Sequence, residues 1–147
     1  MSGELAVRQA ELVAALVAAA PTPPGFDPRR VDAARAALLR KRANGVARHW
    51  PLLAAGLGDA WLTIFTDWAR NRPPRGSLRD GWDLARSLAA VGALPPLSLA
   101  ELTVRESGWC YDGVTPPRRR RLPALRRRGD AVALQVAGRV FLLRWRR

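Results

Sequence analysis

The sequence predicts a mainly α fold: a helical N-terminal body of five to six helices, followed by a small antiparallel β-meander of two to three strands. Three observations predict this class. Apolar residues recur at helical spacing over the first hundred-odd residues, with proline and glycine between the runs. After Gly108 the pattern changes to the alternation typical of strands, and short glycine-containing pairs separate the alternating runs. We therefore expect a helical body over 1–107 and an arginine-rich β-meander packed on it over 108–147.

The first two predicted helices have clear start and stop signals. The first begins at Ser2 or Gly3 and ends by Pro21. Its apolar residues recur at helical spacing: Leu5, Leu12, Val13, Leu16 and Val17. Asp27 followed by Pro28 is an N-cap and first-turn pair. The helix that this pair starts carries one apolar side, formed by Val31, Ala34, Leu38, Ala43, Val46 and Trp50.

Two shorter helices follow. Pro51 begins one that stops near Gly56 and Gly58. Asp59 is then expected to cap a second helix. Its apolar stripe is formed by Trp61, Ile64, Phe65 and Trp68. We expect Trp61 and Trp68 in the core together with Trp50 and Trp82.

Two further helix starts resemble the capping box, in which a hydroxyl side chain is followed three residues later by an acid. Ser77 with Asp80 opens a helix that Gly92 stops. Its apolar residues are Leu78, Trp82, Ala85, Leu88 and Ala89. Ser98 with Glu101 opens a last helix that runs to about Glu106.

The C-terminal part alternates apolar residues with others. One run carries Val132, Leu134 and Val136, and the next carries Phe141, Leu143 and Trp145. Two residues, 137 and 138, separate these runs, and residues 129 and 130 separate the first run from a basic run at 125–128. Two-residue separators with glycine are typical of hairpins, so we predict a three-stranded antiparallel meander.

The net charge of +13 belongs mostly to this C-terminal part. Residues 118–147 hold eleven arginines and one acid, Asp130, whereas the other 117 residues hold 14 basic and 11 acidic groups. Because 24 of the 25 basic residues are arginine, a compositional bias is one source of the residue type. The clustering is therefore the more informative observation.

Cysteine and hydropathy patterns bear on the compartment. The single cysteine, Cys110, cannot form an internal disulfide, which favours a reducing compartment. The apolar run at 12–20 is too short to cross a bilayer, and Glu4 stands where a secretory signal would be basic. We expect a cytoplasmic protein without a membrane segment.

Residues suited to catalysis are few. His49 is the only histidine and lies at a predicted helix junction, and Cys110 lies between aromatics, as a small buried residue does. Asp80 and Asp83 share a helix face, but Asp80 is explained by its place at a helix start. A glycine-rich phosphate loop, a nucleophile elbow and a Cys/His cluster are all absent from the sequence. We expect no enzymatic activity of its own, no cofactor and no metal.

Two kinds of partner fit the basic C-terminal part. Clustered arginines with aromatic residues could follow a nucleic-acid backbone, although the helical part shows no helix-turn-helix pattern. Alternatively, an edge strand could accept an extended acidic peptide, which the arginines would attract and orient. The composition alone does not choose between these partners.

Several short stretches resemble a known family: RQAEL at 8–12, PPGF at 23–26, LLRKRA at 38–43, WPLL at 50–53, FTDW at 65–68 and PRGSLRDGW at 74–82. The family comprises actinobacterial C-terminal domains or partner proteins of multinuclear non-haem iron oxidative enzymes, which are TIM barrels. It is distantly similar in layout to partner subunits once labelled as DNA-binding domains. The resemblance covers roughly residues 8–143 and implies that the chain binds the barrel and presents a ribosomally made precursor (leader) peptide to it. The iron and the chemistry would belong to the barrel, and because the chain starts at Met1, we expect the separate-subunit form.

We expect the peptide to contact the meander, along 132–136 or 139–145, whichever is the edge, with charge supplied by arginines and with two aromatics at the junction of the two parts. Trp109 lies in a glycine-flanked loop and Trp145 among arginines, so each can either close the core or serve a contact surface. The candidate partner-binding or peptide-binding residues are Trp109, Tyr111, Arg126, Arg128, Val132, Leu134, Val136, Arg139, Phe141, Leu143, Arg144 and Trp145.

Overall fold

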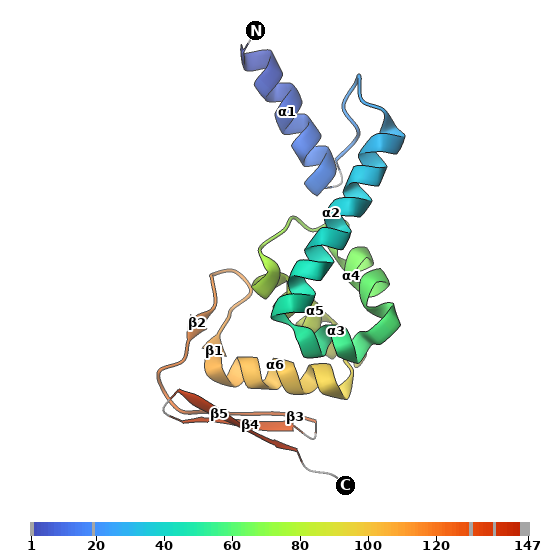
Figure 1. Cartoon of the computed structure of the whole chain (residues 1–147). Helices are drawn as coiled ribbons and strands as arrows, with labels where there is room; N and C mark the ends of the chain where they lie inside the picture. Colours follow the sequence, from blue (N-terminus) through green and yellow to red (C-terminus); the bar gives the residue numbers. More distant parts are fainter. Residues whose placement is uncertain (1, 19, 130, 137, 145–147) are drawn as a thin grey trace.

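The structure is a computed structural model that describes residues 2–18, 20–129, 131–136 and 138–144. Across these residues it has six α-helices, one 3-10 helix and five strands (Figure 1). The elements are α1 (Ser2–Val17), α2 (Pro28–His49), α3 (Pro51–Leu57), η1 (Gly58–Ala60), α4 (Trp61–Ala69), α5 (Ser77–Ala90), α6 (Pro96–Gly108), β1 (Trp109–Cys110), β2 (Arg118–Arg119), β3 (Ala124–Arg128), β4 (Ala131–Val136) and β5 (Arg139–Arg144). The predicted class, mainly α with a C-terminal β-meander, is confirmed.

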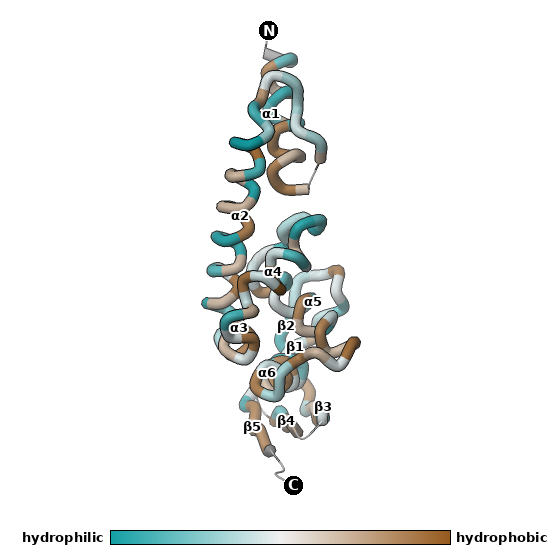
Figure 2. Tube along the Cα trace, turned by 90° about the vertical axis from the view of Figure 1, so that its right-hand side faces the viewer, coloured by the Kyte–Doolittle hydropathy of each residue, from teal (hydrophilic) through white to brown (hydrophobic). Residues whose placement is uncertain are grey.

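Helix α6 forms the layer between the other helices and the strands. It packs against α3 and α5 on one side and against β3, β4 and β5 on the other (Figure 1). Figure 2 shows that the molecule is elongated, with α1 and the start of α2 at one end and the three-stranded sheet at the other. Within the described residues, no helix has the length and apolar character needed to cross a membrane.

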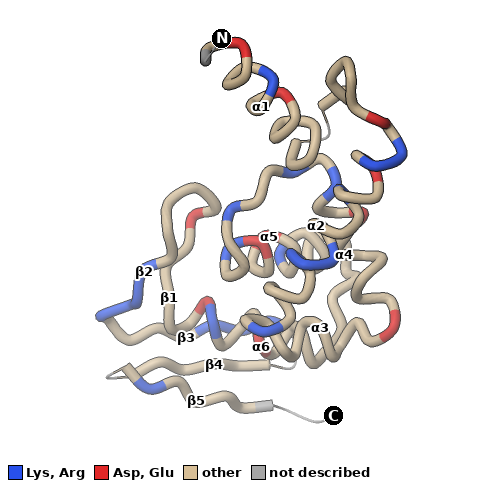
Figure 3. Tube along the Cα trace, turned by 45° about the horizontal axis from the view of Figure 1, so that its top comes forward, with Lys and Arg blue, Asp and Glu red and all other residues tan. Residues whose placement is uncertain are grey.

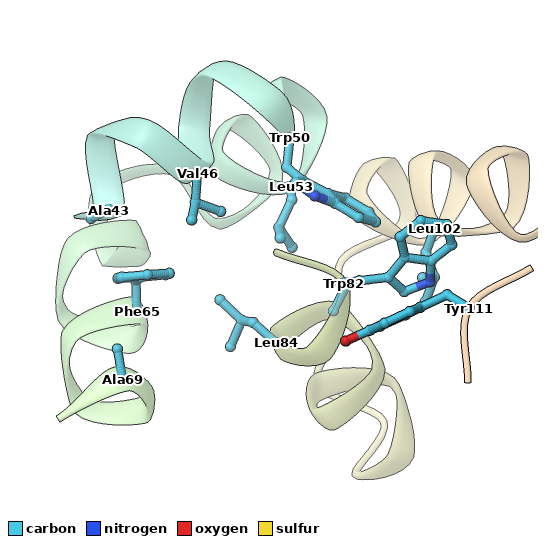
Figure 4. Close-up of a cluster of buried hydrophobic side chains, with 11 residues drawn as sticks. Ala43, Val46, Trp50, Leu53, Phe65, Ala69, Trp82, Leu84, Leu102 and Tyr111 are labelled. Atoms are coloured by element: carbon cyan, nitrogen blue, oxygen red, sulfur yellow. The ribbon is translucent and has the colours of Figure 1, made fainter. Parts of the chain in front are cut away.

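The core is built on two tryptophans. Trp50 and Trp82 are fully buried, and their rings meet edge to face with centroids 5.6 Å apart. Tyr111 packs on Trp82 with a centroid distance of 5.2 Å (Figure 4). The predicted core positions Trp61 and Trp68 are partly buried and pack against this cluster. The apolar stripes predicted for α4 and α5 therefore meet in one core, whereas Leu5 and Val13 of the stripe predicted for α1 are exposed.

Helix α1 packs on α2 at the far end of the molecule. Arg35 in α2 links the two helices, because its Nε donates to the Ala15 carbonyl at 2.6 Å and its guanidinium also donates to the Ala20 carbonyl. The predicted start of α2 is confirmed: the side chain of Asp27 accepts a hydrogen bond from the Arg29 amide at 2.9 Å.

The predicted caps at Asp59 and Ser77 are wrong. Asp59 lies inside the 3-10 turn η1, which runs directly into α4 without a side-chain cap. Ser77 is the first residue of α5 rather than its N-cap, which is Gly76. Asp80 instead accepts hydrogen bonds from the Arg42 guanidinium at 2.8 Å and the Arg75 amide at 3.1 Å. Asp80, which the local pattern assigned to a capping box, thus forms an ion pair with Arg42 of another helix.

The capping box predicted at Ser98 and Glu101 is wrong for a similar reason. Helix α6 begins earlier, at Pro96, a residue whose fixed φ suits the first helical turn. Glu101 accepts a hydrogen bond from the Leu53 amide at 2.7 Å, in the first turn of α3, and the Ser98 hydroxyl donates to the carbonyls of the same turn. Glu101 therefore satisfies a free N–H of another helix.

Strands β3, β4 and β5 form the predicted antiparallel meander, in that order. The register pairs Leu125 with Leu134 and Leu134 with Phe141 across the three strands. Strand β4 is central, so the free edges are β3 and β5, and the stretch 132–136 is not an edge. A separate two-stranded ribbon, β1 with β2, was not predicted from the sequence; in it Trp109 lies opposite Arg119.

Candidate functional site

A polar pocket lies where α5, α6, β1, β3 and the segment after β2 meet. Its volume is about 520 Å3. We call it the junction pocket and define it by its lining residues: Arg86, Glu106, Trp109, Tyr111, Arg120, Arg126, Arg127 and Arg128. Five guanidiniums and one carboxylate line it, so it suits an anionic group.

Glu106 anchors this pocket from α6. Its Oε1 accepts from Arg86 Nε at 2.8 Å, and its Oε2 accepts from two nitrogens of Arg128 at 3.1 and 3.0 Å. Burial raises the pKa of Glu106, but the hydrogen bonds and charges of Arg86 and Arg128 outweigh burial and hold the pKa below its ordinary value. The carboxylate stays ionised and orients two arginines from different elements.

Tyr111 lines the junction pocket and is hydrogen-bonded to residues of α5. Its hydroxyl donates to Asp83 at 3.1 Å, and its carbonyl accepts from Arg86 at 3.0 Å. Burial and the hydrogen bond to Asp83, together with the charge of Asp83, raise the pKa of Tyr111 to about 12. The guanidinium of Arg86 also lies 5.2 Å from the Tyr111 ring centre, a cation–π distance.

The segment that follows β2 lines another side of the junction pocket through Arg120. The Arg120 amide donates to the Gly108 carbonyl at 2.9 Å, and Arg120 Nε donates to the carbonyls of Glu106 and Trp109, each at 3.3 Å. Arg119 lies over the Trp109 ring, 5.1 Å from its centre. These contacts hold β2 and Arg120 against the C-terminal end of α6. Arg120 therefore lines the pocket from a segment that is fixed to the helical body.

The meander turns several large apolar side chains away from the protein. Its inner face, toward α6, includes the buried residues Ala131, Ala133 and Gln135 of β4, and Val140 and Leu142 of β5. Its outer face consists of Leu125, Arg127, Val132, Leu134, Val136, Arg139, Phe141 and Leu143, which alternation and register place together. The side chains of Leu125, Phe141 and Leu143 on this face are 64%, 54% and 64% exposed.

Helix α6 approaches the sheet closely at two glycines. A Cβ on Gly108 would lie 3.4 Å from Val140, and one on Gly129 would lie 3.3 Å from Leu99. At these two glycines the helix and the sheet are in close contact, and Val140 and Leu142 of β5 also face α6. The outer face is therefore an apolar surface without a partner in the described structure.

The structure divides the candidate residues predicted from the sequence into two groups. Four of them line the junction pocket: Trp109, Tyr111, Arg126 and Arg128. Six lie on the outer face: Val132, Leu134, Val136, Arg139, Phe141 and Leu143. Arg144 ends β5 opposite Ala131, and Trp145 lies outside the described residues.

Sequence reasoning missed four residues of the pocket: Arg86, Glu106, Arg120 and Arg127. Arg86 and Glu106 belong to different helices, and only the tertiary structure brings them together. The spacing along the chain carried no signal for this pair. Arg120 and Arg127 were within the recognised basic runs, but the runs alone did not distinguish them from their neighbours.

The residues considered for catalysis have other contacts. His49 ends α2 with Nδ1 3.1 Å from the Gly45 carbonyl, and Asp80 pairs with Arg42. Cys110 is exposed, so the expectation of a small buried residue is wrong; it lies in the short β1–β2 ribbon at the surface. In the described ranges, no group of three or more His, Cys, Asp or Glu residues is placed to hold a metal ion.

Comparison with known proteins identifies relatives of this chain. Residues 6–90 match the family described as SCO6045-like, C-terminal domain, a match that ends with α5, before α6 and the strands. The chain is also 36% identical, over 132 residues, to a UPF0276 protein of Streptomyces avermitilis. That similarity covers 89% of this chain and 27% of the relative, so the chain spans about a quarter of the relative's length. No solved structure matches the chain. Because the family match covers more than half of its residues, the chain belongs to the SCO6045-like C-terminal domain family.

Proposed function

We propose that this protein is a non-catalytic partner subunit that binds a multinuclear iron oxidative enzyme and helps recognise and present its ribosomally made precursor peptide. The observation that carries the proposal is the outer face of the meander. It exposes large apolar side chains on a sheet whose strands β3 and β5 both have a free edge. Exposed apolar patches and free edges are features of surfaces that bind other chains.

The charge of the same segment indicates which chain would bind. From residue 113 to the end the sequence contains eleven arginines and a single acid, Asp130. An acidic or amphipathic peptide complements this charge, and its apolar side chains could pack on Leu134 and Phe141. A second copy of this face would instead bring like charges together.

The family relationship supports a role beside a larger protein. The matching family is described as a C-terminal domain, and the Streptomyces avermitilis relative extends well beyond the part that this chain matches. A domain found within longer proteins is suited to serve a neighbouring domain or subunit. In the proposal the iron and the oxidative chemistry belong to the enzyme, and this chain supplies binding.

A co-expression pull-down tests the proposal. The tagged protein is expressed with the barrel enzyme and the precursor peptide, and we expect all three to be recovered together. Phe141→Ser, at an exposed position, is expected to release the peptide while leaving the fold intact. Val91→Ser is the matched control, because Val91 is 75% exposed and lies at the end of α5 rather than on a strand. Equal recovery of peptide with both variants would contradict the proposal.

A nucleic acid is the second candidate partner. The observation in its favour is the group of exposed arginines on β2 and β3, which includes Arg118, Arg119 and Arg126 (Figure 3). Such a binder would hold arbitrary duplex at low salt and lose affinity steeply as salt rises. Retention of duplex by the pull-down sample at the expense of peptide would favour this alternative.

A further inference from the structure

The lining residues of the junction pocket indicate that it adjoins the free edge of β3. Arg126, Arg127 and Arg128 are consecutive strand residues, and all three line the pocket. Side chains alternate between the faces of a strand, so three consecutive residues can line one pocket when the pocket lies beside the edge. The other edge of β3 is occupied by β4. The main-chain groups at the free edge of β3 therefore adjoin a space lined by guanidiniums.

Arg126 and Arg128 point to the same side of β3, two residues apart. Successive residues of one face are about 6.5–7 Å apart along a strand. Glu106 already fixes the Arg128 guanidinium from the helix side, whereas no carboxylate of the described residues forms an ion pair with Arg126 or Arg120. The pocket thus combines one oriented guanidinium with others available to a bound anion.

The available main-chain edge favours a peptide as the occupant. An added strand pairs through its own N–H and C=O groups, at the spacing that β3 presents, and its side chains alternate with the same period. Carboxylates at positions i and i+2 of such a strand face the same side, as Arg126 and Arg128 do. Carboxylates at adjacent positions face opposite sides and cannot both enter the pocket.

We propose that the junction pocket recognises an extended acidic segment that pairs with the edge of β3 and directs two carboxylates, two residues apart, at Arg126 and Arg128. The inference rests on the proposed function, because the segment would belong to the peptide that the protein presents. It assigns the acidic specificity to this pocket, and it leaves the outer face to apolar contacts. Glu106 and Arg120 act as positioning residues for the guanidiniums and for the wall of the pocket.

Two peptides of identical composition test the spacing. The probes are acetyl-Thr-Glu-Thr-Glu-Thr-amide and acetyl-Thr-Glu-Glu-Thr-Thr-amide, titrated into the full chain at low salt and followed by NMR. Threonine suits a strand and keeps the probes soluble. The alternating probe is expected to bind about tenfold more tightly, since one charge-assisted hydrogen-bonded pair contributes on that order. Equal affinities, or no binding of either probe at millimolar concentration, would overturn the inference.

Two single-charge variants locate the effect. Arg126→Gln is expected to abolish the preference for the alternating probe. Arg121→Gln removes the same charge from an exposed arginine that does not line the pocket, and it should keep the preference. Loss of the preference in both variants would indicate general charge attraction and overturn the inference. Pyrophosphate that binds more tightly than the alternating probe and displaces it would assign the pocket to phosphates instead.

The pull-down described above separates this inference from the proposed function. If the probes show no spacing preference while the precursor peptide is still recovered and is released by Phe141→Ser, the inference alone fails. If no peptide is recovered with the wild-type protein, the proposed function fails, and a spacing preference then remains a property of the pocket itself.

Discussion

The indole ring of Trp50 lies directly against the backbone of Gly81. A Cβ on Gly81 would stand 2.2 Å from Cδ1 and 2.5 Å from Nε1 of Trp50, closer than any real contact. Trp50 Nε1 also donates to the Leu78 carbonyl at 2.9 Å, one turn earlier in α5. This contact locks the end of α2 onto α5 at the centre of the core.

Gly81→Ala is therefore expected to destabilise the protein, although alanine normally favours a helix over glycine by about 1 kcal/mol. Overpacking a core typically costs about 1–3 kcal/mol, and here Trp50 is fully buried and has no room to move. Thermal or urea unfolding measures the change. Gly3→Ala in α1 is the control, because nothing lies within 4 Å of its Cβ, and it should be neutral or slightly stabilising. A Gly81→Ala protein as stable as the wild type would show that the indole can move aside.

Glu101→Ala should lower the free energy of unfolding by about 1–2 kcal/mol, the usual effect of losing an N-terminal helix cap. The Leu53 amide donates a buried hydrogen bond to Glu101, and in the variant this N–H would have no acceptor. Glu4→Ala, at an exposed position of α1, is the matched control. Equal stability of the two variants in urea unfolding would contradict the assigned cap.

Glu106→Gln should lower the free energy of unfolding by roughly 1–2 kcal/mol at neutral pH, because charge-assisted hydrogen bonds are lost while two partly exposed arginines remain screened by solvent. The pKa of Glu106 is held below its ordinary 4.5. Its ionised form therefore contributes stability above the unfolded pKa, and that contribution is lost as the pH falls through the folded pKa. Urea unfolding from pH 7 to pH 3 should show a smaller acid-induced loss in the variant than in the wild type. Parallel curves would assign the acid sensitivity to other carboxyl groups.

Tyr111 is the only tyrosine, so its ionisation can be followed by ultraviolet absorbance without interference from other phenols. We expect a pKa of about 12 and a lower value in Asp83→Asn, which removes the charge that disfavours the phenolate. Since the folded pKa is raised, the related stability is present below the unfolded pKa and is lost as the pH rises through the folded value. An unchanged pKa in Asp83→Asn would contradict the contribution of the Asp83 charge.

The helices and the meander could be predicted because their signals are local. Apolar spacing predicted α2 and α5, and the strand alternation around Leu134 predicted the sheet. Local signals failed where a side chain serves a distant element. Ser98 and Glu101 form a capping-box pattern, yet both bind the first turn of α3, more than forty residues away along the chain.

The candidate site was predictable only in part, for the same reason. Basic runs and alternation identified Arg126, Arg128 and the apolar residues of the strands. They could not show which face of the sheet lies against α6, since this depends on how the helix and the sheet pack together. The sequence patterns also could not predict the ion pair between Arg86 of α5 and Glu106 of α6.

Helix α6 lies between the helical core and the strands, so the strands and the core can differ in the free energy of local unfolding. The face of β3–β5 toward α6 consists mainly of small or partly exposed residues, among them Ala131, Ala133 and Leu142, whereas α5 packs through the fully buried Trp82 and the aromatic core. Detaching the strands exposes far less apolar surface than opening the core, so it costs less free energy. In native-state hydrogen exchange, the amides of β4 should exchange as one cooperative unit at a lower free energy than those of α5. The sheet that we propose to bind a partner would then be the part of the molecule most readily ordered by that partner.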